Sequence, residues 1–208
     1  MKKIAIVLCS FFGLLSCNDV LDLENISSYN PDLVWNDENL ANAYMANLYP
    51  VFGNWSTGAD SNSQQIEGIV WYPDRITISN GEYKNWDYDR IRLINQAILD
   101  VEQGSLPRDV KDAIIGQAKF LRAYVYFGMV MYHGGVPYIT VPQDRYEDDL
   151  YVSRNTTKES FELILKDLDD AIALLPQRHL STSDEFGKID ASFALAFRAK
   201  VMLYQASP

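Results

Sequence analysis

The pattern of apolar and polar positions predicts a chain built mainly from helices. The longest pattern covers residues 107–132, where apolar residues recur every three or four positions, the spacing of one helical face. From Phe120 to Tyr132 the other faces are apolar too, which is typical of a buried helix. A membrane span needs about 20 apolar residues without a central charge, and this shorter stretch contains Arg122. We expect the helix to end at Gly134, which accepts a left-handed cap at little cost.

The same periodicity predicts four further helices. Their expected ranges are 36–48, 85–103, 156–175 and 190–205, the last one capped by Asp190. Trp35 and Leu40 occupy the two positions of a hydrophobic staple around an Asn36 cap, which predicts the start of the first helix. Thr156 and Glu159 have the spacing of a capping box at the start of the fourth.

The segments between these helices are mostly polar. Residues 51–84 form an expected loop that is long for a compact domain, and a loop of this length is usually functional or disordered. Residues 136–141 are expected to be a short extended segment, because Pro137 and Pro142 limit its hydrogen bonding. Two polar loops, 143–155 and 177–187, complete the predicted chain.

An internal repeat relates two parts of the sequence. Residues 95–99 resemble residues 169–173, and the pattern Ala-x-x-x-Arg-Ala of residues 118–123 returns at residues 194–199. Two helices that recur in this way are typical of tetratricopeptide-like arrays. The sequence therefore predicts a mostly α fold of tetratricopeptide-like helix pairs with long loop insertions and little β structure.

The N-terminus has the features of an export signal. Lys2 and Lys3 precede the apolar stretch 4–15, which has the length of a signal peptide and is short for a membrane anchor. The stretch ends in Leu14-Leu15-Ser16-Cys17, which resembles a bacterial lipobox. The resemblance implies cleavage before Cys17 and acylation of its thiol, and two or three acyl chains give lasting membrane association. An ordinary secretory leader is the alternative.

This leader divides the chain and accounts for its cysteines. We expect a signal peptide at residues 1–16, a lipidated tether at 17–34 and a helical domain at 35–208. Cys9 leaves with the leader and Cys17 is acylated, so the mature chain is expected to have no free thiol and no disulfide. That expectation excludes thiol catalysis and cysteine-ligated zinc.

The charge of the chain bears on its partners. The formal net charge is −10 at pH 7, and an acidic surface repels phosphate backbones, so nucleic acid is not expected as a partner. The acidic surface suits a neutral ligand.

Large aromatic side chains and amides gather in the long loop. Sugar rings present apolar C–H faces that stack on flat aromatic rings, and amides bind sugar hydroxyls. The candidate ligand residues are Trp55, Trp71, Tyr72, Asn54 and Asn80. The alternative is that these aromatics pack the loop onto the helices, which we favour for Trp86.

The remaining titratable residues favour structural roles. Arg122 and Arg198 hold equivalent places in the repeat, and we expect both to be paired structurally, because a buried arginine needs a carboxylate or several carbonyls. His133 and His179 lack ligand spacing, so we predict no metal site and no cofactor. A run of acids in the loop 143–155 is expected to be a solvated surface: Asp144, Glu147, Asp148 and Asp149. A glycosidase needs two carboxylates across a cleft, so we do not expect an enzyme.

Residues 117–140 resemble the signature helix of the SusD/RagB family. The matching residues are Ala118, Phe120-Leu121-Arg122-Ala123-Tyr124, Tyr126-Phe127 and Gly134-Gly135-Val136-Pro137. Members of the family are surface lipoproteins of Bacteroidetes-type bacteria that capture nutrients, mostly glycans, for an outer-membrane transporter. The resemblance extends over most of the mature chain, from the lipobox cysteine to the Ala-rich last helix.

This resemblance implies a function without catalysis. It implies an outer-membrane, lipid-anchored, surface-exposed protein that captures an oligosaccharide and delivers it to a SusC-like TonB-dependent transporter. Ligand residues in the family sit in variable loops, so none can be transferred by motif. The alternatives are a tetratricopeptide-like scaffold lipoprotein that binds protein segments in the cell envelope, and a surface glycosidase. Family members are usually more than twice this long, so we expect the chain to be an N-terminal portion, truncated at its C-terminus.

Overall fold

Helices are the only regular elements in the described part of the chain, which comprises residues 30–53, 86–183 and 185–207 of a computed structural model. The elements are α2 (Pro31–Val34), α3 (Glu38–Ala46), the 3-10 helix η2 (Tyr49–Phe52), α4 (Tyr88–Gln103), α5 (Arg108–His133), α6 (Thr157–Leu174) and α7 (Ala191–Gln205). The absence of strands from these ranges confirms the predicted fold class. All of these elements belong to the unit that starts at Pro31.

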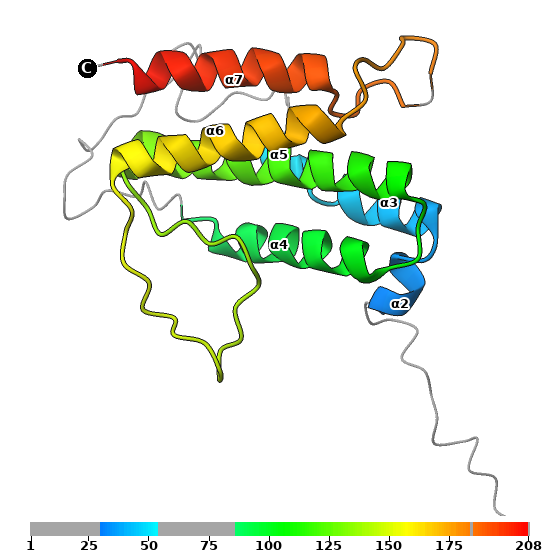
Figure 1. Ribbon diagram of the computed structural model, residues 1–208, viewed down its shortest axis with the longest axis horizontal. Coiled ribbons are helices and arrows are strands. Elements are labelled where there is room, and N and C mark those ends of the chain that lie inside the picture. The colour runs from blue at the N-terminus through cyan, green and yellow to red at the C-terminus, as the bar shows by residue number, and fades with distance from the viewer. Residues whose placement is uncertain (1–29, 54–85, 184, 208) are drawn as a thin grey trace, which may run out of the picture. The chain divides into compact units, whose positions relative to one another are not determined.

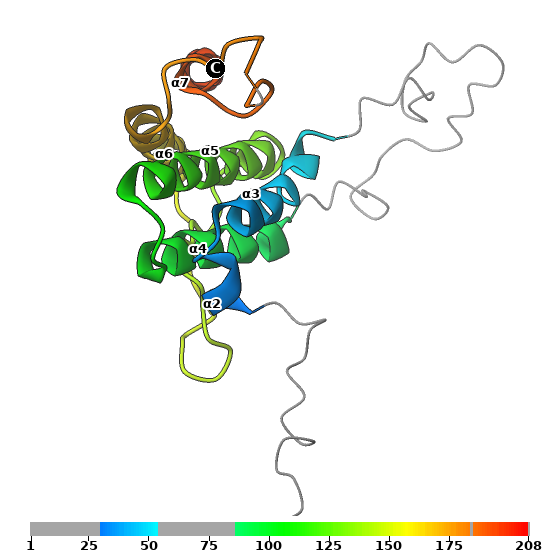
Figure 2. The ribbon, with the colours of Figure 1, turned by 90° about the vertical axis from the view of Figure 1, so that its right-hand side faces the viewer.

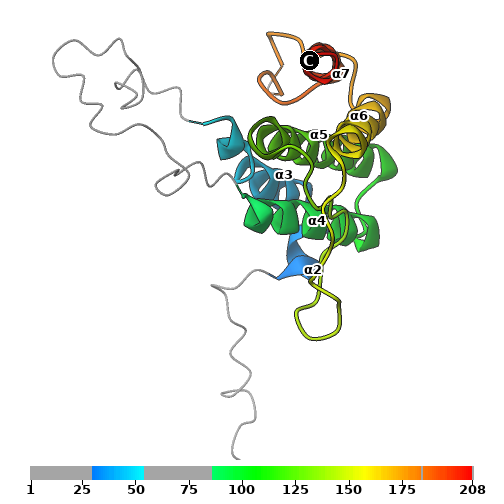
Figure 3. The ribbon, with the colours of Figure 1, turned by 90° about the vertical axis from the view of Figure 1, so that its left-hand side faces the viewer.

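The four long helices lie side by side in chain order. Figure 1 shows α4, α5, α6 and α7 stacked one after another, each running opposite to the one before, and the views in Figure 2 and Figure 3 agree. The short helix α3 packs against a side of α5 that neither α4 nor α6 covers. Helix α5 therefore contacts α3, α4 and α6, and this central position explains why its sequence is apolar on every face.

Helix α5 ends as the sequence predicts. Gly134 is its C-cap with φ of 70°, a conformation that glycine adopts without strain. The next residue, Gly135, lies against the backbone of Asn155, and a Cβ there would come within 1.9 Å of the Asn155 carbonyl oxygen. The prediction that the apolar face reaches Tyr132 was wrong, because this side chain is 57% exposed.

The start of α3, the first of the predicted helices, differs from the prediction. The cap of α3 is Asp37, whose carboxylate accepts hydrogen bonds from the amides of the second and third helical residues. The predicted cap, Asn36, instead accepts a hydrogen bond from the amide of Ser105 at 2.8 Å. Trp35 is buried but Leu40 is 46% exposed, so the predicted staple does not form. A tertiary contact thus removed Asn36 from the helix end, and the neighbouring carboxylate, favoured by the helix dipole, took its place.

The other predicted caps are confirmed. The Thr156 hydroxyl accepts a hydrogen bond from the Glu159 amide at 3.2 Å, and the Glu159 carboxylate accepts one from the Thr156 amide at 2.8 Å. This hydrogen bond from the backbone lowers the pKa of Glu159. Asp190 caps α7 by accepting the amide of Phe193 at 2.8 Å.

Two boundaries shift by a few residues. Residues 31–34, which we expected in the tether, form the short helix α2. The helix expected from residue 85 is observed from Tyr88, and residue 85 itself lies outside the described residues, as does most of the predicted loop 51–84.

The internal repeat is visible in an equivalent contact within each helix pair. Arg122 of α5 donates to the Asn95 side chain of α4 at 2.8 Å. Arg198 of α7 donates to the Asp169 side chain of α6 at 2.6 Å. Asn95 and Asp169 occupy matching places in the repeat, so α4–α5 and α6–α7 are equivalent pairs, as tetratricopeptide-like arrays require.

Candidate functional site

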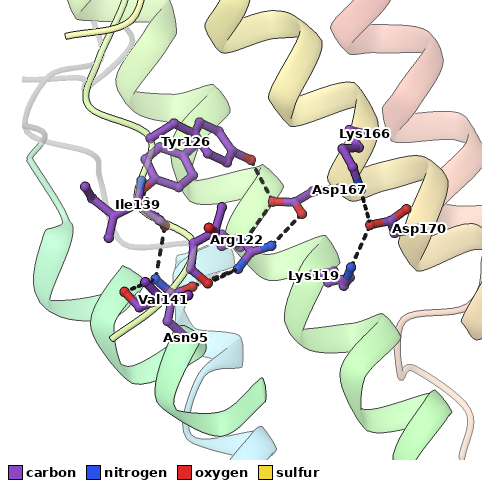
Figure 4. Close-up of polar contacts among 11 residues, drawn as sticks. Asn95, Lys119, Arg122, Tyr126, Ile139, Val141, Lys166, Asp167 and Asp170 are labelled. Carbon is purple, nitrogen blue, oxygen red and sulfur yellow. Dashed lines mark hydrogen bonds and ion pairs between the residues drawn. The ribbon is translucent and has the colours of Figure 1, made fainter. Parts of the chain in front are cut away.

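A buried polar network centred on Arg122 joins the central helices (Figure 4). Its guanidinium donates to both carboxylate oxygens of Asp167, at 2.7 and 2.6 Å, and to the Asn95 side chain at 2.8 Å. Arg122 is 5% exposed and Asp167 is 4% exposed. Bidentate pairing of this kind satisfies a buried arginine, so the structural pairing predicted for Arg122 is confirmed.

The same network holds the segment that follows α5. The Tyr138 hydroxyl donates to Asp167 at 2.7 Å, and the backbone carbonyl of Thr140 accepts from Arg122 at 3.1 Å. Asn95 donates to the carbonyl of Ile139 at 3.0 Å. Burial, with the neighbouring Asp167 carboxylate, raises the pKa of Tyr138 well above its ordinary value. Every group in the network is used for pairing, so its role is to position α4, α5, α6 and the segment 136–141.

Arg198 also pairs as predicted, but at the surface. Its guanidinium reaches Asp169 at 2.6 Å, while the two side chains are 31% and 55% exposed. The two repeat arginines therefore make pairs of the same length in different surroundings.

Trp86 lies against the C-terminal end of α5. Its ring stacks on His133 with centroids 4.0 Å apart, and the Arg154 guanidinium lies 6.0 Å from the Trp86 ring centroid. Trp86 packs as we favoured, although 44% of it is exposed. His133 serves as its stacking partner.

A concave surface, here called the aromatic cavity, lies between η2, α5, α7 and residues 178–179 and 186–190. Its volume is about 670 Å³, within the range of roughly 300–1,000 Å³ that is usual for small-molecule sites. Six aromatic residues line it: Tyr49, Phe52, Tyr124, Phe186, Phe193 and Phe197.

Ring contacts between helices fix the wall of the aromatic cavity. The ring of Phe52 lies 4.9 Å from that of Tyr124 and 6.1 Å from that of Phe193. The Tyr124 ring lies 5.2 Å from Phe197. The Tyr49 hydroxyl bonds to two partners, and burial raises its pKa to about 12, so it stays neutral. Rings held in this way form a rigid apolar surface.

Charged side chains surround the same cavity. Arg178, Lys188 and Lys200 are three cations in its lining, and Asp190 is the one acid among the lining residues. Lys188 pairs with Glu185 at 2.5 Å, and both Asp190 oxygens accept backbone amides. Arg178 and Lys200 are exposed and form no ion pair with any residue that the structure describes.

None of the predicted ligand residues can be compared with this cavity. Trp55, Trp71, Tyr72, Asn54 and Asn80 all lie outside the described residues, as does Cys17. The aromatic cavity was not predicted from the sequence, although a signal was present. Phe193 and Phe197 are four residues apart, which places both rings on one side of their helix.

The acidic loop is a solvated surface, as predicted. Asp144, Glu147, Asp148 and Asp149 are all exposed, and three of them accept hydrogen bonds from amides of the loop itself. Among the described residues, no group of three or more potential metal ligands is close enough to hold an ion. In the same part of the chain no helix has both the length and the apolar character of a membrane span.

Comparison with known proteins identifies SusD-like relatives. A SusD-like family described as "Starch-binding associating with outer membrane" matches residues 19–203. A SusD-like protein of Formosa agariphila is 27% identical over 96% of this chain and 41% of its own length. The crystal structure of a SusD-like protein from Bacteroides fragilis superposes with a TM-score of 0.69 at 25% identity, over 88% of this chain and 37% of that one.

A laminarin-binding SusD-like protein superposes with a TM-score of 0.53 at 26% identity, over 60% of this chain and 27% of its own. The present chain thus spans less than half the length of each of these three relatives. Because the family match covers residues 19–203, with the Arg122 helix at its centre, the chain belongs to the SusD-like family, which is associated with the outer membrane.

Proposed function

We propose that the protein captures an oligosaccharide at the cell surface and delivers it, without cleaving it, to a SusC-like TonB-dependent transporter. Membership of the SusD-like family carries this proposal. The aromatic cavity supports it, because flat rings held rigidly beside polar side chains suit the C–H faces and hydroxyls of a sugar. The laminarin-binding relative shows that a protein of similar fold takes a glycan.

Transfer to a transporter is tested by purification from outer membranes. The chain is tagged at its C-terminus, extracted in detergent and captured. A partner of transporter size in equal amount supports delivery. Capture of the chain alone, or with unrelated envelope proteins, refutes it.

The lipid anchor at Cys17 is tested by acylation. We expect a clickable fatty acid to label the chain through Cys17, because the residue ends a lipobox-like sequence. Cys17→Ala should lose the label and leave the membrane fraction. Cys9→Ala is the matched control, because that cysteine leaves with the leader and its loss should change neither result. Label retained in Cys17→Ala contradicts this anchor.

Two places for the glycan are distinguished by two sets of variants. One set changes the loop residues Trp55, Trp71 and Tyr72 to Ala. The other changes Phe186 and Phe193 to Ala, which are 66% and 49% exposed and whose truncation should leave the fold intact. We expect the cavity variant to lose glycan affinity, and a further loss in the loop variant would add those rings to the site. If both folded variants bind glycan as the parent does, neither place is the site.

The outer surface of α7 favours a second candidate function. Leu195, Met202 and Leu203 are 48%, 46% and 73% exposed. In helical arrays such an apolar face contacts another segment, which fits a scaffold that binds protein. The purification described above separates the two functions, since a scaffold brings down assembly proteins in place of a transporter.

A further inference from the structure

The charge of the aromatic cavity is opposite to that of the whole chain. The chain carries 28 acidic and 18 basic residues, yet three cations and one acid line the cavity. Lys188 is already paired with Glu185, which leaves Arg178 and Lys200 as cations without a carboxylate among the described residues. Two cations that have no carboxylate partner in the described ranges, both at one cavity, give an acidic protein a local site for a negative group.

We propose that the aromatic cavity binds an acidic saccharide, one whose sugar ring carries a carboxylate or a sulfate. The inference rests on the proposed function of glycan binding and specifies the class of glycan. The ring lies against the aromatic wall, which includes Phe193 and Phe197 of α7. The oxyanion is held by Arg178 and Lys200, which border the same hollow.

The two cations differ in what they contribute. The Arg178 guanidinium presents a planar set of donors that matches a carboxylate or sulfate with two parallel hydrogen bonds. Lys200 adds a compact charge on a flexible stem, and its nitrogen lies 5.9 Å from the centroid of the Phe127 ring. Lys200 lines the aromatic cavity together with Phe193 and Phe197 of its own helix. A saccharide that covers the wall also excludes water from these charges, which strengthens their attraction for an anion.

This inference departs from what the acidic composition suggests. A net charge of −10 suits a neutral ligand when the charge is spread evenly. At physiological salt, screening limits the range over which exposed charges interact to about 8 Å. The charged groups next to the ligand therefore decide its binding, and distant acids contribute little. Three of the four charged side chains that line the cavity are cations, and the fourth, Asp190, already accepts two backbone amides.

The test compares saccharides that differ only in charge. Oligogalacturonate and its methyl ester form the first pair, which has the same sugar with and without charge. A sulfated galactan oligosaccharide and its desulfated form are the second pair. Binding of each to the whole chain is measured by calorimetry at roughly 20 mM and 500 mM salt. We expect at least one acidic member to bind about tenfold more tightly than its neutral partner at low salt, and the difference to shrink at high salt.

Two double variants locate the effect. Arg178→Gln with Lys200→Gln should reduce the affinity for the acidic saccharide to that for its neutral partner. Arg145→Gln with Lys158→Gln removes the same charge from exposed positions outside the aromatic cavity and should leave the preference intact. Circular dichroism and the melting temperature establish that both variants are folded.

The outcomes separate failure of the acidic-ligand inference from failure of the proposed glycan binding. Equal affinity for acidic and neutral members refutes the acidic ligand and leaves glycan binding standing. A preference that survives in Arg178→Gln with Lys200→Gln places the anion elsewhere and refutes this site. If no saccharide of either kind binds the folded chain, the inference fails together with glycan binding by this chain.

Discussion

The buried pair of Arg122 and Asp167 allows a sharp test of how the fold is held together. Asp167→Asn keeps the shape of the side chain but removes the charge that faces the guanidinium. Both partners are 6% exposed at their side chains, so the arginine would stay buried without a compensating charge. Removal of one partner of a buried pair costs about 3–5 kcal/mol in the free energy of unfolding. For a domain of this size that corresponds to a fall of about 6–20 °C in melting temperature.

The repeat supplies a matched control two positions further along the same helix. Asp169 pairs with Arg198 at 2.6 Å, the same distance as the Nη2 contact of the buried pair, but these side chains are 31% and 55% exposed. Water screens this pair, so Asp169→Asn should cost at most about 1 kcal/mol. The two variants therefore differ in burial, while the substitution and the helix are the same.

The assay is urea unfolding followed by circular dichroism at 222 nm, with the slope compared between variants. Similar costs for Asp167→Asn and Asp169→Asn would refute the reasoning that burial sets the magnitude. A second check replaces both buried partners, Arg122→Met with Asp167→Leu. This double variant should lose less stability than the sum of its two single changes, because no charge is left unpaired. Simple additivity would contradict that expectation.

Three further predictions concern the cap, the tight turn and alkaline pH. Thr156→Ala should lower the free energy of unfolding by about 1 kcal/mol through loss of the capping box, and Thr156→Ser should restore most of it, which urea unfolding measures. Gly135→Ala should cost about 1–3 kcal/mol, since its Cβ would meet the backbone of Asn155, and a melting temperature equal to that of the parent would count against the close approach. Burial holds the pKa of Tyr138 above its unfolded value of about 10, so its contribution to stability is complete below pH 10 and falls as pH rises beyond it. Tyr138→Phe should make the loss of stability between about pH 10 and 11 less steep, and an unchanged slope would show that this hydroxyl titrates normally in the folded chain.

The helices could be predicted because the signals that define them are local. The capping box at Thr156 and the glycine stop at Gly134 each involve residues within one turn of the helix end, and both are confirmed. The burial of α5 could also be predicted from the sequence, because a helix that is apolar on all faces has no polar side to present to water. The error at Asn36 shows the limit of this reasoning. Its side chain accepts a hydrogen bond from the amide of Ser105, and this contact forms only when the segment after α4 packs beside the start of α3.

The network around Arg122 was predicted only in part. The sequence indicated that a buried arginine needs a carboxylate, but several acids were available and nothing local selected Asp167. That choice required α6 to lie against α5, which brings residues 45 positions apart to within 2.6 Å. The different exposure of Arg198, at an equivalent place in the repeat, follows from the same packing, because α5 has neighbours on several sides while α7 contacts α6.

By itself the sequence determined the helical class, the helix ends at Gly134, Thr156 and Asp190, the repeat and the resemblance to the SusD-like family, because each depends on spacing along the chain. Only the tertiary structure decided which carboxylate Arg122 pairs with, and that rings from η2, α5 and α7 share one cavity with Arg178 and Lys200. The physical reason is distance. Periodicity and capping act over a few residues, whereas a cavity and a buried ion pair are made by side chains that meet only after the helices have packed.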